Sequence, residues 1–177
     1  MIAGDTEAPA RFWQPRFDYE HRADGTVLMW QPDPLEPHDR VLPAYLDYWA
    51  DAAPDRTWIA RRDADGDWRR INFAEGRAQA HAIGAALLEL GLGPDRPLLI
   101  LSENSLEHAL LGLACACTGI PFAPVSPAYA LMSKDHAKLR DIAALLRPGA
   151  VFADDGAGFA PALQAIAAEG RQVITVT

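Results

Sequence analysis

Apolar residues follow two different periods along the chain, and the alternation of these periods predicts its architecture. Short, continuous apolar runs occur at residues 97–101, 120–125, 150–153 and 173–176. Between them lie segments whose apolar residues recur every three to four positions, as on one face of a helix. Continuous apolar strands that alternate with single helices are typical of right-handed βαβ units in a parallel sheet. We therefore predict an α/β fold in which helices flank a parallel sheet.

Start and stop signals place the helices. One begins near Leu42, with Pro43 in its first turn, and ends before Pro54. Asn72 and Glu75 have the spacing of a capping box and should open a long helix that Gly91 ends. The following segment, 106–117, is apolar on nearly every side, so it should lie deep in the domain. Ser102 or Asn104 is expected to cap it, Ser133 should cap a helix with an apolar face at 139–146, and the last helix should span 159–168.

The first forty residues have a different character. Asp24-Gly25 separates two strand-like runs, 17–21 and 26–30, and this pattern favours a tight hairpin. Prolines at 32, 34 and 37 then form a connector that cannot be helical. We interpret 1–40 as an N-terminal β-hairpin arm that packs on the main domain, 41–177. A second hairpin is expected from 57–62 and 67–71 around the turn 63–66.

Charge and composition narrow the class of protein. The formal net charge of −8 argues against nucleic-acid binding, which depends on basic residues that neutralise phosphates. The chain shows neither an apolar run of roughly 18 residues nor the pattern of a secretory signal, so we expect no membrane span and a cytoplasmic location. Cys115 and Cys117 point in different directions on a helix, which favours small core residues over a disulfide or metal site.

The search for catalytic motifs finds candidates but no complete site. Neither of the glycine-rich phosphate-binding patterns and no G-x-S-x-G motif occurs in the chain. His108 is the histidine best placed for function, near the end of a strand, although a structural role suits it better. The run Asp154-Asp155-Gly156 also follows a strand and could hold Mg²⁺, but a turn initiated by aspartate is the simpler interpretation.

Several stretches resemble adenylate-forming acyl-CoA synthetases, in the same order along the chain. They are the strand-to-helix opening WRRINFAE (68–75), the turn LLELGLGPDR (87–96), the strand and helix start LILSENSLEH (99–108) and the crossover GLACACTGIPFAPVSPAY (112–129). Asn72, Phe73 and Gly76 depart from the common Thr, Tyr and Leu of the first pattern, and Pro94-Asp95 stands where Gly-Asp is usual. Within this superfamily the chain is most similar to feruloyl-CoA synthetases, through 64–78, 99–129 and 145–163.

The resemblance implies an enzyme that activates a carboxylic acid, aromatic or other, with ATP and Mg²⁺ and transfers the acyl group to CoA. It also implies that the phosphate loop, the ribose-binding aspartate and the catalytic lysine lie on later sequence than Thr177. We therefore expect an N-terminal segment of such a synthetase, without catalytic residues of its own and inactive alone. We expect no metal site and no tightly bound cofactor in this segment. An exposed apolar surface could let it self-associate.

The loop after the crossover strand lies near the CoA nucleotide in related synthetases. By position, this loop gives Ser126, Pro127 and Tyr129, with Lys134 nearby, as candidates for a CoA or substrate cleft. A surface turn shaped by prolines explains the same residues equally well. The competing function is a freestanding, non-catalytic α/β module that binds a partner or a small ligand, and it would lack a large uncovered apolar surface.

Overall fold

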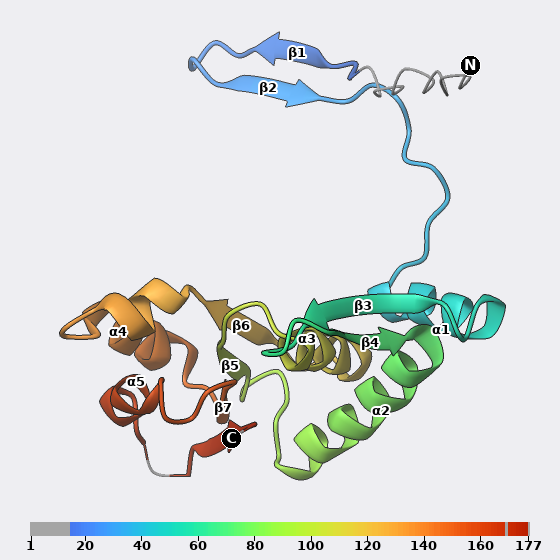
Figure 1. Ribbon diagram of the computed structural model, residues 1–177. Helices are drawn as coiled ribbons and strands as arrows, with labels where there is room; N and C mark the ends of the chain where they lie inside the picture. Colours follow the sequence, from blue (N-terminus) through green and yellow to red (C-terminus); the bar gives the residue numbers. More distant parts are fainter. Residues whose placement is uncertain (1–14, 169, 177) are drawn as a thin grey trace, which may run out of the picture. The chain divides into compact units, whose positions relative to one another are not determined.

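The computed structural model describes residues 15–168 and 170–176 (Figure 1). Contacts within the chain define two compact units, Met1–His38 and Asp39–Thr177. The first unit contains an antiparallel hairpin of β1, Asp18–His21, and β2, Val27–Trp30, with Tyr19 opposite Met29. Gly25 adopts a φ of 87° in the turn, a conformation that glycine accepts without strain. The predicted hairpin is confirmed, and its packing on the main domain stays a prediction.

The second unit is built on a four-stranded parallel sheet. Its strands are β5, Leu98–Leu101, β6, Phe122–Val125, β7, Ala150–Ala153, and β8, Gln172–Thr175. Their spatial order is β6-β5-β7-β8, and each neighbouring pair runs parallel. All four strands lie within one or two residues of the apolar runs in the sequence. This sheet confirms the predicted fold class.

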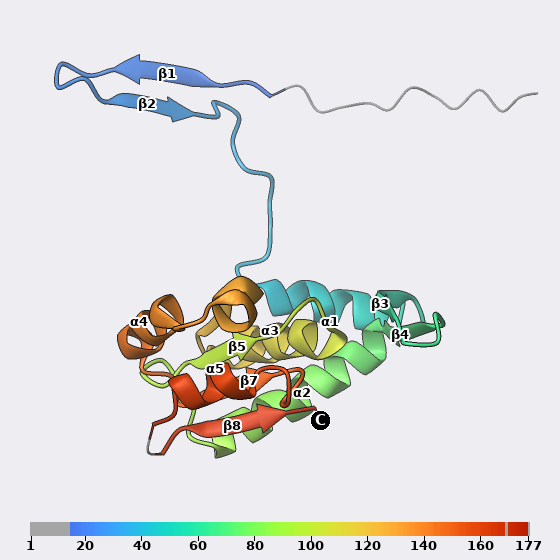
Figure 2. The ribbon, with the colours of Figure 1, turned by 60° about the vertical axis from the view of Figure 1, so that its left-hand side comes forward.

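Alternate residues of the strands enter two separate cores. Leu98 and Ile100 belong to a cluster with residues of α1, Leu42–Ala52, α2, Phe73–Glu89, and α3, Leu106–Thr118. Leu99 and Leu101 belong to a second cluster, with residues of α4, Ala137–Leu146, and α5, Ala160–Ala165. Figure 2 shows α4 and α5 on one side of the sheet and α2 and α3 on the other. Because both faces are covered, every residue of β5 and β7 is buried, which explains their continuous apolar sequences.

A second antiparallel hairpin leads into α2. It consists of β3, Thr57–Arg62, and β4, Trp68–Asn72, as predicted. The Asn72 side chain accepts a hydrogen bond from the Glu75 amide, and the Glu75 carboxylate accepts one from the Asn72 amide. The capping box read from the sequence is therefore formed. α3 buries six of its residues, in agreement with its apolar composition.

Four local predictions are corrected. The cap of α3 is Ser105, whose hydroxyl accepts from the His108 amide, and neither Ser102 nor Asn104 has this role. Ser133 accepts from the His136 amide, in the turn that precedes α4, and does not cap the helix itself. The proline-framed loop contains one π-helical turn, η1, Ala128–Met132, because Pro127 already has helical dihedrals. The last helix is shorter than the predicted 159–168. Within the described residues, no helix is long and apolar enough to cross a membrane.

Candidate functional site

The strand order places a topological switch point at the carboxyl edge of the sheet. β5 leads through α3 to β6 on one side, whereas β7 leads through α5 to β8 on the other. The connections that leave β5 and β7 therefore diverge between these two adjacent strands. In open α/β sheets such a switch point is where ligands bind. We place the candidate site at this edge.

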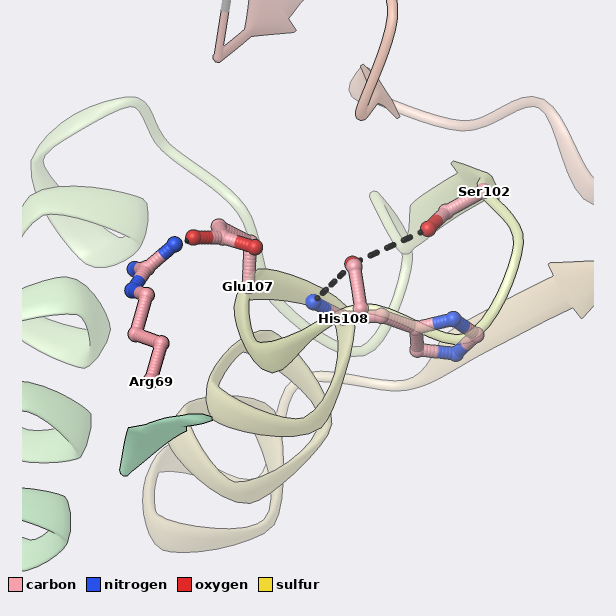
Figure 3. Close-up of polar contacts among 5 residues, drawn as sticks. Arg69, Ser102, Glu107 and His108 are labelled. Carbon is pink, nitrogen blue, oxygen red and sulfur yellow. Dashed lines mark hydrogen bonds and ion pairs between the residues drawn. The ribbon is translucent and has the colours of Figure 1, made fainter. Parts of the chain in front are cut away.

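A chain of hydrogen bonds joins the ends of β5 and β7 at this edge. Ser102 directly follows β5 and Asp154 directly follows β7, and the Ser102 hydroxyl donates to the Asp154 carboxylate at 2.9 Å. The Ser105 hydroxyl lies 3.2 Å from that of Ser102 and accepts from the His108 amide at 3.0 Å. Each hydroxyl has one proton, so Ser105 donates to Ser102 when Ser102 donates to Asp154. The chain links the first turn of α3 to both strand ends. Figure 3 shows the part of it between Ser102 and His108.

Burial stabilises the hydrogen bonds of Ser102 and Ser105. Ser102 is 4% exposed and Ser105 is 9% exposed, so water competes little for their hydroxyls. No buried side-chain nitrogen or oxygen among the described residues lacks a hydrogen-bond partner. The first turn of α3 is thus fixed relative to the sheet edge.

Beside this hydrogen-bond chain lies a groove of about 630 Å³ between the loops that follow β5 and β6. Polar side chains on one wall and prolines on the other define it. Its lining residues are Ser102, Glu103, Asn104, His108, Pro124, Val125, Ser126 and Pro127. A smaller groove, of about 330 Å³, lies between β3 and α3 and shares Asn104 and His108 with the first. The N-terminus of α3 therefore borders two concave surfaces.

The structure separates the four cleft candidates from one another. Ser126 and Pro127 line the larger groove. Tyr129 lies in η1 and packs against the core beneath α4, with the Lys138 ammonium 5.1 Å from its ring centroid. Lys134 is exposed in the loop between η1 and α4 and is not part of the groove lining. Only the first two candidates thus share a surface with His108.

The remaining polar candidates have structural contacts. The His108 imidazole lies 3.3 Å from the Glu103 carbonyl oxygen, a contact that joins the ring to the loop between β5 and α3. Asp155 accepts from the Gly158 amide at 2.8 Å, the hydrogen bond of an aspartate-initiated turn. In residues 15–168 and 170–176, no three His, Cys, Asp or Glu side chains are grouped so that they could hold a metal ion.

Both cysteines are core residues. Burial raises the pKa of the Cys115 thiol to about 11. The pKa of Cys117 is also raised, mainly by burial and then by the negative charge of Asp47. Because the thiolate is the reactive form, neither side chain is activated as a nucleophile near neutral pH.

The groove does not fit the triphosphate of ATP by itself. Its ionisable lining consists of Glu103 and His108, without lysine or arginine. Arg69 of the β3–β4 hairpin is already paired with Glu107 at 2.6 Å (Figure 3). Phosphate binding relies on cations or on clustered backbone amides. The groove is better suited to the uncharged or aromatic part of a ligand.

The cap of α3 leads to a first prediction. Replacing Ser105 with alanine should lower the free energy of unfolding by about 1 kcal/mol, because the His108 amide loses its acceptor and Ser102 loses a donor. Urea unfolding followed by circular dichroism measures this change. Ser126→Ala, at an exposed position of the same groove, is the matched control and should be neutral. Equal stability of the two variants would contradict the role of Ser105.

The sequence did not reveal the link between Ser102 and Asp154. The two residues are 52 positions apart, and their contact depends on β5 and β7 being neighbours. One signal was present: each polar residue directly follows a buried apolar strand, so both had to lie at the same edge of a parallel sheet. The position of Ser105 directly before Leu106 was also visible, but three polar residues competed for the cap.

Comparisons with known proteins find a matching family model and similar folds. Residues 46–177 match the family model described as AMP-binding enzyme. The structure of McyG A-PCP complexed with phenylalanyl-adenylate has a TM-score of 0.65 and 20% sequence identity, and the match covers 80% of this chain and 26% of that one. The fatty acid AMP ligase from Legionella pneumophila has a TM-score of 0.57 and 18% identity, over 66% of this chain and 20% of that one. Likeness at this identity shows a shared fold.

A curated relative matches at the sequence level. A protein described as a nonribosomal peptide synthetase, CymA, from Salinispora arenicola (strain CNS-205) is 30% identical over 97 residues. The match covers 55% of this chain and 1% of that protein. The chain therefore spans a small part of the sequence relatives and about a quarter of the McyG structure.

Proposed function

Because the chain belongs to the AMP-binding enzyme family, we propose that it is the N-terminal part of an enzyme that adenylates a carboxylic acid. The match over residues 46–177 is the observation that carries this proposal. It includes the whole parallel sheet and both loops that form the larger groove. A carboxylate resists attack by a nucleophile, whereas a mixed anhydride with AMP has a good leaving group. Adenylation is therefore the step that makes acyl transfer possible.

The finer proposal is an acid–CoA ligase similar to feruloyl-CoA synthetases. It is supported by the ordered motifs at 64–78, 99–129 and 145–163. ATP, Mg²⁺ and CoA would be its co-substrates, and a hydroxycinnamate or another carboxylic acid would be its substrate. The relatives include a structure with phenylalanyl-adenylate and a fatty acid AMP ligase, so an amino acid and a fatty acid are the competing substrate classes.

Within this proposal, the described residues give the groove its shape and hold its two rims in position, whereas other residues bind the phosphates of ATP. Ser126 and Pro127 form one rim of the groove, and His108 and Asn104 form the other. The fixed first turn of α3 keeps the second rim in place through Ser105 and Ser102. We propose Ser126 and Pro127 as the residues that border CoA or the acyl group. Tyr129, in η1, and Lys134, in the loop between η1 and α4, lie outside the groove lining and would affect the groove only through the position of this segment.

The proposal predicts that residues 1–177 alone release no pyrophosphate. The groove lacks cations for the ATP phosphates, and the phosphate-binding motifs do not occur in the chain. Purified protein is incubated with MgATP and, in separate reactions, ferulate, phenylalanine or a fatty acid, and pyrophosphate is measured with a coupled assay. We expect no release above that of the protein-free control with any acid.

A variant distinguishes true activity from a contaminating ligase. If pyrophosphate appears, Asn104→Leu, which fills the shared rim of both grooves, should reduce it when the chain itself is responsible. Leu145→Ala, at an exposed position of α4, serves as the control for purification. Acid-dependent release that Asn104→Leu abolishes would refute the inactivity of the segment. It would also identify the acid that the site accepts.

A further inference from the structure

The smaller groove, between β3 and α3, differs from the larger one in its charge. Its ionisable lining residues are Arg61, on β3, and His108, on α3, and none of the described residues that line it is acidic. The larger groove instead contains Glu103. In a chain with a formal net charge of −8, the smaller groove is therefore a local exception. A cleft lined by one sign of charge raises the local concentration of ions of the opposite sign.

The packing of the β3–β4 hairpin explains why Arg61 lies beside α3. Side chains of a strand alternate between its two faces, so Ile59 and Arg61 share one face of β3. Ile59 packs against the cluster that Ile71 forms with Leu106 and Leu110 of α3. This apolar part of the face attaches the hairpin to the helix. Arg61, two residues further along the same face, is thereby held at the groove.

Arg61 has a cationic neighbour and no ion-pair partner of its own. It lies opposite Arg69 in the register of the hairpin, and like charges in this position repel each other. Glu107 of α3 pairs with Arg69 at 2.6 Å (Figure 3). The ion pairs found in the described part of the chain do not include Arg61. One carboxylate thus balances only one of the two guanidinium groups, and Arg61 keeps its capacity to bind an anion.

The other lining residues indicate the kind of anion that fits. Ile59, Leu106 and Ala109 give the groove an apolar wall, and Asn104, in the loop before α3, offers the N–H donors of its amide. A guanidinium group binds a carboxylate or a phosphate through two parallel hydrogen bonds. The volume of about 330 Å³ lies near the lower end of the range for small-molecule sites. These features suit a small molecule in which one oxyanion group is attached to an apolar body.

We propose that the groove between β3 and α3 binds a small organic anion, with the oxyanion group on Arg61 and Asn104 and the apolar body against Ile59 and Leu106. All lining residues lie between positions 59 and 109, on elements that pack directly on each other. Binding there requires neither ATP nor the adenylation step, so the inference does not depend on the proposed function. Carboxylates and phosphate esters share the required chemistry, and the experiment separates them.

An NMR titration of ¹⁵N-labelled residues 1–177 with benzoate, phenyl phosphate and benzamide tests this proposal. The first two ligands carry different oxyanion groups on the same ring, and benzamide is the uncharged analogue of benzoate. We expect the signals of Arg61, Asn104 and Leu106 to shift, with a dissociation constant on the order of 1 mM for at least one of the two anions. Benzamide should bind about fivefold more weakly or less, because it lacks the charge-assisted hydrogen bonds. The better anion identifies the oxyanion group that the groove accepts.

Two substitutions should change the affinity in opposite directions. Arg61→Gln removes the cation and should weaken binding of the anion about tenfold. Glu107→Gln leaves Arg69 without its carboxylate beside Arg61 and should strengthen binding about threefold. Arg140→Gln, at an exposed position of α4, is the matched control and should leave the affinity unchanged. Circular dichroism of each variant verifies that it is folded.

The proposal is overturned if neither anion shifts the signals of the groove residues at concentrations up to about 20 mM, well above the expected constant. Benzamide that binds as tightly as benzoate and phenyl phosphate also overturns it, because charge would then have no role. An affinity that folded Arg61→Gln leaves unchanged, or that Arg140→Gln lowers equally, assigns the binding to another surface. An affinity that Glu107→Gln lowers contradicts the contribution of the two guanidinium groups.

Discussion

Replacing Leu99 with alanine should lower the free energy of unfolding by about 2–5 kcal/mol, the largest effect that we expect from a single substitution in this protein. Leu99 lies in the middle of β5 and is completely buried. It packs in the core between the sheet and α4 and α5. The neighbours on β6 and β7 are held by the sheet, so they cannot move in to fill the cavity. The lost contacts and the cavity therefore both add to the cost.

The same substitution at Leu145 provides the control, because this leucine of α4 is 81% exposed. Leu145→Ala should change stability by less than about 0.5 kcal/mol. Urea unfolding of the two variants, followed by circular dichroism and fitted with a common slope, gives the comparison. A difference below about 1 kcal/mol between them would show that β5 is not the rigid centre of the sheet.

Gly84→Ala should also destabilise the protein, although alanine is the better helix former. Gly84 lies in α2 against α3, and a Cβ atom there would approach Thr118 Cγ2 to 2.8 Å and the Ala114 carbonyl oxygen to 3.4 Å. The Thr118 rotamer is held because its hydroxyl donates to the Ala114 carbonyl oxygen at 2.9 Å. Overpacking of this kind costs about 1–3 kcal/mol, against a helix-propensity gain of about 1 kcal/mol, so we expect a net loss of stability of up to about 2 kcal/mol.

A double substitution tests whether this close approach is the cause. Thr118→Ser removes the methyl group that alanine at position 84 would meet and keeps the hydroxyl. We expect the double variant to recover about half or more of the loss, a coupling that a double-mutant cycle measures directly. Gly93→Ala has open space around its Cβ position and should be neutral. If the stability changes of the two single substitutions simply add up in the double variant, the contact between positions 84 and 118 is not the cause of the loss.

The secondary structure was predictable from the sequence because its causes are local. The capping box at Asn72 and Glu75 was correct in the sequence, since it depends on two residues that are three positions apart. The runs that became β5 and β7 were recognised as buried strands because continuous apolar sequence suits a strand that is covered on both faces. Their parallel pairing followed from the intervening helices.

Predictions from the local sequence were wrong where the same residues were compatible with more than one local structure. Ser102, Asn104 and Ser105 can all accept a bond from a helix amide, and the sequence alone did not rank them correctly. The structure assigns the cap to Ser105 because Ser102 is held at the strand end by Asp154. η1 was missed for a similar reason: prolines suggest a loop, yet Pro127 also fits the start of a helical turn.

The candidate site likewise has some features that follow from the sequence and others that depend on the tertiary structure. The sequence by itself determined the alternation of strands and helices, the apolar faces and the motifs that place the chain near one family, because these properties depend on neighbours along the chain. Only the tertiary structure decided that β5 and β7 are adjacent, that Ser102 meets Asp154, and that Ser126 shares a groove with His108 while Lys134 does not. Strand order is set by the packing of whole helices on the two faces of the sheet, and no local pattern contains that information.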